Sequence, residues 1–129
     1  MKRFSLLWLS LVFLTGCASG IQTGKSPAYR QVSQKEAAAI MAAETGYLIL
    51  DVRTHEEYNG GHIPGAICLP NENIGTEQPA ELPDLDQLIL VYCRSGNRSK
   101  HAAKKLADLG YTNIVEFGGI NTWTGEIVT

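Results

Sequence analysis

The chain has few cysteines and histidines and no excess of basic residues. Only three cysteines and three histidines occur among 129 residues. They form no Cys-x-x-Cys pair and show no spacing typical of metal ligands, so we expect neither a metal nor another cofactor. Eleven Lys and Arg side chains stand against thirteen Asp and Glu, which gives a formal net charge of −2. Because nucleic-acid binding requires a basic surface, this balance argues against a nucleic-acid partner.

Apolar runs in the chain are short, and the longest of them lies at the N-terminus. Two basic residues precede an apolar stretch at positions 4–14, which is too short to span a bilayer as a stable helix. The small residues Thr15 and Gly16 come directly before Cys17. This segment resembles a bacterial lipoprotein signal peptide, which implies cleavage before Cys17 and lipidation of that residue. The alternatives are an ordinary secretory signal or an uncleaved anchor in which Cys17 is incidental.

These patterns predict three parts: a signal peptide at 1–16, a lipidated flexible tether at 17–28 and a single folded domain at 29–129. The tether is small and polar, and the remaining length suits one domain with one core. Cleavage would remove Lys2 and Arg3 from the eleven basic residues and leave nine against thirteen acidic ones, a net charge of −4. We expect a lipid-anchored protein on the periplasmic face of a bacterial membrane. Because no Asp follows Cys17, the resemblance to lipoprotein signals implies the outer membrane rather than the inner one.

Apolar runs alternate with helical patterns from residue 29 onward. The predicted strands are 29–32, 47–50, 66–69, 88–92 and 113–117. The predicted helices begin after Ser33 and Thr54, each followed three residues later by Glu as in a capping box, and at Ser99. Residues 70–86 indicate only loop or weak helix. Strands alternating with helices predict an α/β fold with a mostly parallel sheet covered by helices on both faces.

The most informative stretch runs from Tyr92 to Ser99, with the sequence Tyr-Cys-Arg-Ser-Gly-Asn-Arg-Ser. It places Cys93 where an apolar strand stops and just before a helix starts. The backbone N–H groups of residues 94–99 and the positive end of that helix would form a bowl around the sulfur. Such surroundings favour the thiolate, which is the nucleophilic form of cysteine. Two arginines in the same loop add positive charge, so the stretch indicates a nucleophilic cysteine that handles a small anion.

Four segments of the chain carry a joint pattern: Leu50-Asp51-Val52-Arg53 with Glu57-Tyr58, Gly61-His62-Ile63-Pro64-Gly65-Ala66, the loop from Cys93 to Arg98, and Leu109-Gly110-Tyr111 leading to Gly118-Gly119 and Trp123. Together they resemble the rhodanese-like domain of sulfurtransferases over about residues 28–125. The resemblance implies a five-stranded parallel sheet with flanking helices. It also implies that Cys93 accepts sulfane sulfur as a persulfide, from thiosulfate or a similar anionic donor, and passes it to a thiol or cyanide acceptor.

The residues of the loop suggest separate roles. Gly96 can adopt the positive φ that turns the loop amides inward, while Ser95 and Asn97 can brace the turn through local hydrogen bonds. One of the two arginines should face the anionic donor and the other should pair with a carboxylate. We favour Arg98 for the anion and Arg94 for the bracing pair.

Residues outside the loop are expected to have supporting roles. Asp51 could orient a loop arginine or cap the next turn, and we favour structural support. Arg53 should pair with Glu57, or else point into the mouth of the site. His62 is expected to bond to backbone rather than transfer a proton. Cys68 reads as a small buried side chain, although a disulfide with Cys93 is the alternative.

Two other functions share parts of this pattern. Cysteine-dependent phosphatases and arsenate reductases also use a loop from Cys to Arg, but they place one residue more in it than the four between Cys93 and Arg98. A persulfide carrier or binding module without efficient turnover would need the same cysteine. The sequence does not separate that module from an enzyme, and it leaves the physiological donor, the acceptor and the oligomeric state open.

Overall fold

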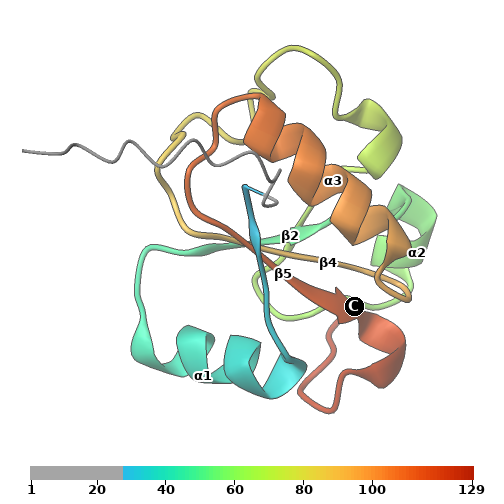
Figure 1. Ribbon diagram of the computed structural model, residues 1–129. Coiled ribbons are helices and arrows are strands. Elements are labelled where there is room, and N and C mark those ends of the chain that lie inside the picture. The colour runs from blue at the N-terminus through green and yellow to red at the C-terminus, as the bar shows by residue number, and fades with distance from the viewer. Residues whose placement is uncertain (1–27) are drawn as a thin grey trace, which may run out of the picture.

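A computed structural model describes residues 28–129, which form a five-stranded parallel sheet with the order β1-β5-β4-β2-β3 (Figure 1). The strands are β1 (Arg30–Gln31), β2 (Leu48–Asp51), β3 (Ile67–Cys68), β4 (Ile89–Cys93) and β5 (Ile114–Gly119). All five lie where the sequence predicts strands, and the fold class is confirmed. The predicted signal peptide, Cys17 and the tether up to residue 27 lie outside the described residues.

Helices cover both faces of this sheet. The α-helices are α1 (Gln34–Ala43), α2 (His55–Asn59) and α3 (Asn97–Asp108), and the short 3-10 helices are η1 (Asn71–Asn73) and η2 (Ile120–Thr122). Figure 1 shows α1 below the sheet and α3 above it. Ser33 caps α1 by accepting from the N–H of Glu36 at 3.1 Å. Thr54 and Glu57 form the reciprocal capping box that their spacing predicts.

The core has two layers because the central strands are buried on both sides. Side chains of α1 pack with one set of strand residues that includes Leu90, Tyr92 and Phe117. Side chains of α3 pack with the alternate set, which includes Val91 and Cys93. Every residue of β4 is buried, as expected for the middle of a parallel sheet. Alternation along β4 therefore turns the Cys93 side chain toward α3.

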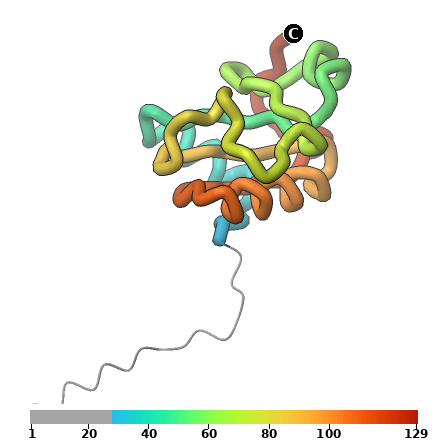
Figure 2. Tube along the Cα trace, turned by 90° about the horizontal axis from the view of Figure 1, so that it is seen from above, coloured from blue at the N-terminus to red at the C-terminus, as the bar shows by residue number. Residues whose placement is uncertain are grey.

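The connection from β3 to β4 contains η1 and otherwise only loops, as the sequence indicates. Figure 2 shows it as the yellow-green part of the tube. It is tied to the core because Leu82 is fully buried and its carbonyl accepts a hydrogen bond from the Tyr111 hydroxyl. Within residues 28–129, no helix is both long enough and apolar enough to cross a membrane.

Candidate active site

Cys93 ends β4, and its side chain lies beside the start of α3. The residue is 1% exposed, and the N–H of Gly96 donates to its sulfur at 3.0 Å. Gly96 is the N-cap of α3 and no side chain caps this end, so the first-turn N–H groups lack the partners that a capping side chain supplies. Together with the helix dipole, these groups stabilise negative charge near the sulfur. The predicted placement of Cys93 at a strand-to-helix turn is thus observed.

Two glycines give the loop its shape. Gly96 has a φ of +106°, a conformation that L side chains rarely adopt. At Gly119 a Cβ atom would overlap the carbonyl of Arg94, because the loop packs directly on the end of β5. The N–H of Asn121 donates to that same carbonyl at 3.2 Å. The end of β5 and the following η2 therefore support the loop.

The bracing expected of Ser95 and Asn97 comes instead from Ser99, in the first turn of α3. Its hydroxyl lies 3.0 Å from the Gly96 carbonyl and 2.7 Å from Oε1 of Glu116. The Cys93 sulfur lies 3.4 Å from the same hydroxyl. Sequence reasoning missed Glu116, and the available signal was an acidic residue inside the otherwise apolar strand Ile-Val-Glu-Phe.

The two loop arginines differ in their partners. Arg98 forms a bidentate ion pair with Glu57 of α2, with N–O distances of 2.7 and 2.9 Å. Hydrogen bonding from Arg98 lowers the pKa of Glu57 to about 2. Arg94 is exposed and takes part in none of the ion pairs among residues 28–129. The expectation that Arg94 is the bracing arginine was therefore wrong, because the guanidinium that reaches a carboxylate belongs to Arg98.

Asp51 and Arg53 pair with each other at the carboxyl end of β2. The shortest contact joins Nη2 of Arg53 to Oδ2 of Asp51 at 2.6 Å, and the same nitrogen donates to the Gly61 carbonyl at 2.7 Å. Tyr92 donates to Asp51 at 2.7 Å and accepts from the N–H of Ile63. The expected pairing of Arg53 with Glu57 was wrong, and Asp51 orients neither loop arginine. Both residues brace the segment before β3.

The second cysteine lies in different surroundings. Cys68 is half-buried, whereas Cys93 is buried, and the two do not form a disulfide. Burial, followed by the nearby charge of Asp51, raises the pKa of Cys68 to about 11. At neutral pH this thiol is almost fully protonated, so it is a poor nucleophile.

His62 bonds to the backbone, as predicted. Its Nδ1 lies 3.0 Å from the Tyr58 carbonyl, and its ring stacks on the Tyr58 ring with centroids 3.8 Å apart. These contacts fix the turn that precedes β3 and give His62 a structural role.

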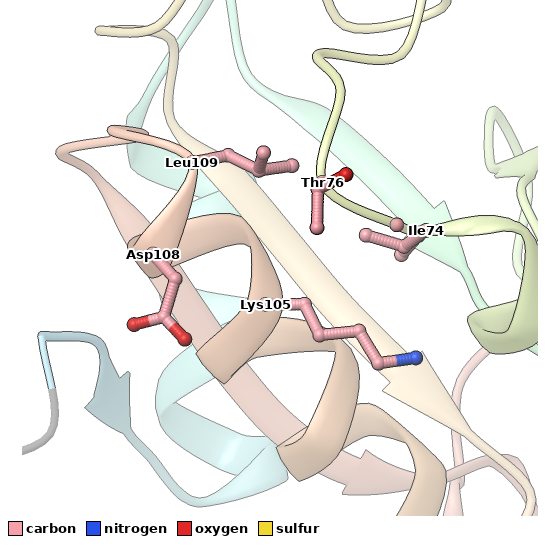
Figure 3. Close-up of a pocket in the computed structure, with 6 residues that line it drawn as sticks. Ile74, Thr76, Lys105, Asp108 and Leu109 are labelled. Atoms are coloured by element: carbon pink, nitrogen blue, oxygen red, sulfur yellow. The ribbon is translucent and has the colours of Figure 1, made fainter.

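A hollow of about 400 Å³ lies between α3 and residues 74–76. Figure 3 shows Ile74, Thr76, Lys105, Asp108 and Leu109 around it. The ammonium of Lys105 donates to the backbone and side chain of Asn71 at 2.8 and 3.0 Å. Neither of the two described cysteines lines this hollow, and no residue of the loop from 93 to 98 does. Among residues 28–129, no three His, Cys, Asp or Glu side chains are grouped to hold a metal ion.

Fold and site together define an α/β protein in which a central parallel strand ends in a cysteine whose sulfur accepts a hydrogen bond from one backbone N–H. The chain belongs to the rhodanese family, since the family model described as rhodanese-like domain matches residues 33–126. The resemblance drawn from the four sequence segments is thereby confirmed at the level of the family.

Similar proteins include sulfurtransferases of different sizes. The chain is 33% identical over 96 residues to the thiosulfate sulfurtransferase GlpE of Pseudomonas entomophila, covering 74% of this chain and 84% of the relative. It is 34% identical over 89 residues to the adenylyltransferase and sulfurtransferase UBA4 of Meyerozyma guilliermondii; the match covers 63% of this chain and only 21% of that relative. A solved structure of a rhodanese with anions from E. coli is 30% identical with a TM-score of 0.59, covering 64% of this chain and 98% of that one.

Proposed function

We propose that this protein is a thiosulfate sulfurtransferase that carries sulfane sulfur on Cys93. The observation that carries the proposal is the Cys93 sulfur beneath the uncapped start of α3, 3.0 Å from the N–H of Gly96. Backbone amides aimed at a sulfur stabilise a thiolate and, after transfer, the negative outer sulfur of a persulfide. The relative named a thiosulfate sulfurtransferase supports thiosulfate as the donor.

The reaction has two displacement steps. The Cys93 thiolate attacks the outer sulfur of thiosulfate, the S–S bond of the donor breaks, and sulfite leaves with the bonding electron pair. A thiolate or cyanide acceptor then attacks the outer sulfur of the persulfide, and Cys93 leaves as a thiolate. Neither step requires a general base when the attacking sulfur or cyanide enters as an anion, because the leaving groups are stable anions.

Attraction of the anionic donor falls mainly to Arg94 in this proposal. The charge of Arg98 is largely offset by Glu57, since both oxygens of that carboxylate are engaged by its guanidinium. The exposed Arg94, which directly follows Cys93, has no such partner among the described residues. Arg98 holds the start of α3 against α2 and so keeps the loop in shape.

Steady-state assays with thiosulfate and cyanide test the proposal. Cys93→Ser should lose all turnover, because serine cannot form the persulfide. Cys68→Ser should keep the parent's rate and is the matched control, since it makes the same chemical change at a half-buried site. Full activity in Cys93→Ser would refute the proposal. A parent protein that takes up one sulfur but does not turn over would favour the persulfide carrier.

The location proposed for this protein is the periplasmic face of the outer membrane, with a lipid anchor on Cys17. It rests on the basic start, the short apolar run and the small residues before Cys17. Labelling of cells with a fatty acid, followed by fractionation, tests it in the full chain. The parent should carry label and sediment with membranes, and Cys17→Ala should do neither. A parent that is unlabelled and absent from membranes would refute the anchor but not the sulfur chemistry.

A further inference from the structure

A chain of hydrogen bonds leads from Cys93 to a buried carboxylate that the sulfur-transfer steps do not use. Ser99 lies 3.4 Å from the Cys93 sulfur and 2.7 Å from Oε1 of Glu116. Glu116 is only 3% exposed and also accepts from the N–H of Gly118 at 2.8 Å. These contacts join β4, α3 and β5 at the base of the loop.

The Ser99 hydroxyl has a single hydrogen, and its neighbours decide where that hydrogen points. The carboxylate of Glu116 is the closest acceptor and the only charged one, so it takes the hydrogen. The Ser99 oxygen then faces Cys93 as an acceptor, and the partner that suits it is the protonated thiol. Glu116 thus opposes the thiolate in two ways: by its negative charge, and by turning the hydroxyl hydrogen away from the sulfur.

Other charged groups lie near Cys93 and Glu116. Arg98 of α3 lies within electrostatic range of Cys93, and it is in turn influenced by Glu57 of α2 and by Glu72 of η1. Glu116 borders a groove of about 420 Å³, whose lining includes Lys100 of α3 and the neutral Gln34 of α1. Among residues 28–129, Glu116 is the charged residue that hydrogen bonds connect to Cys93 through a single side chain, that of Ser99.

We propose that Glu116 is a positioning residue that acts through Ser99 to raise the pH at which Cys93 becomes a thiolate. A thiol with greater proton affinity is a stronger nucleophile once ionised, but it is a slower leaving group. Glu116 therefore slows release of sulfur from the Cys93 persulfide, and it speeds capture only at a pH above the Cys93 midpoint, where the thiolate fraction is already high. This consequence rests on the proposed function, whereas the effect on the protonation of Cys93 does not.

The pH profile of Cys93 alkylation by iodoacetamide, a neutral reagent, tests the proposal. In Glu116→Gln the midpoint should move to lower pH by about one unit, a tenfold gain in thiolate at a fixed pH below the midpoint. Glu44→Gln makes the same change at an exposed residue near the end of α1 and should leave the midpoint in place. A midpoint in Glu116→Gln that is unchanged or moves to higher pH would overturn the proposal.

Ser99→Ala gives a second test that does not depend on the folding of Glu116→Gln. With the hydroxyl hydrogen held by Glu116, Ser99 stabilises only the thiol, so its removal should move the midpoint to lower pH. A move to higher pH would mean that Ser99 donates to the thiolate, and it would overturn the proposal. Failure of sulfur transfer in the parent, with both profiles shifted as expected, would refute the proposed function and leave this inference standing.

Discussion

Replacing Asp51 by Asn should strongly destabilise the domain while leaving its shape intact at low temperature. Asp51 is fully buried and accepts hydrogen bonds from the backbone and side chain of Arg53 and from the Tyr92 hydroxyl. Arg53 is only 6% exposed, so asparagine would leave a buried guanidinium without its counter-charge. Breaking a buried pair in this way costs about 3–5 kcal/mol. That is a large part of the roughly 5–15 kcal/mol that stabilises a typical domain.

Urea unfolding of the parent and the variant, followed by circular dichroism, measures this change. Asp108→Asn is the matched control, because Asp108 pairs with Lys104 at 3.5 Å on the surface, with both side chains at least 70% exposed. Its loss should change the free energy of unfolding by less than about 0.5 kcal/mol. The double variant Asp51→Asn with Arg53→Met should recover much of the loss, since it also removes the buried charge. A loss below about 1 kcal/mol in Asp51→Asn would refute the claim that this pair braces the fold.

Three further outcomes follow from the site. Arg94→Ala should raise the KM for thiosulfate about ten- to a hundredfold, because a charge-assisted contact is lost, and it should barely change the step with the acceptor. If Arg98→Ala alone raised this KM, Arg98 rather than Arg94 would be the arginine that binds the donor. Glu57→Gln should lower stability by about 1 kcal/mol at neutral pH. The depressed pKa of Glu57 means that this difference is full above its ordinary value of 4.5 and fades as pH falls through about 2, and a difference that grows in acid would contradict the ion pair. Gly119→Ala should cost about 1–3 kcal/mol and slow Cys93 alkylation, because a Cβ there overlaps the Arg94 carbonyl; an unchanged rate would show that the loop does not depend on β5.

Local patterns in the sequence predicted most of the fold. The helix starts at Ser33 and Thr54 depend on residues three positions apart, and both caps are present. The strands depend on apolar runs, and the run that ends at Cys93 is entirely buried. The observed bounds of the elements differ from the predicted ones by one or two residues. For example, α3 begins at Asn97 rather than at Ser99.

The partners of charged residues could not be predicted in the same way. Arg98 meets Glu57 across a separation of 41 positions, so only the tertiary structure, which places Glu57 of α2 within reach of Arg98, decides which arginine finds a carboxylate. Arg53 has carboxylates close to it in the sequence, among them Asp51 and Glu57. It pairs with Asp51, whereas Glu57 accepts from the N–H of Thr54 at the start of α2, and spacing alone does not distinguish these two arrangements. Glu116 contacts Ser99 only because β5 lies beside β4 in the sheet. Such contacts depend on the tertiary structure rather than on spacing along the chain.

The mass of the protein after exposure to thiosulfate tests the central claim most directly. The claim predicts a gain of one sulfur atom, roughly 32 Da for a persulfide, on the peptide that contains Cys93, and loss of that mass when cyanide is added. Cys68, whose pKa is raised to about 11, should gain nothing. Sulfur found on Cys68, or no gain at all under conditions in which the protein turns over thiosulfate, would contradict the assignment of Cys93 as the sulfur carrier.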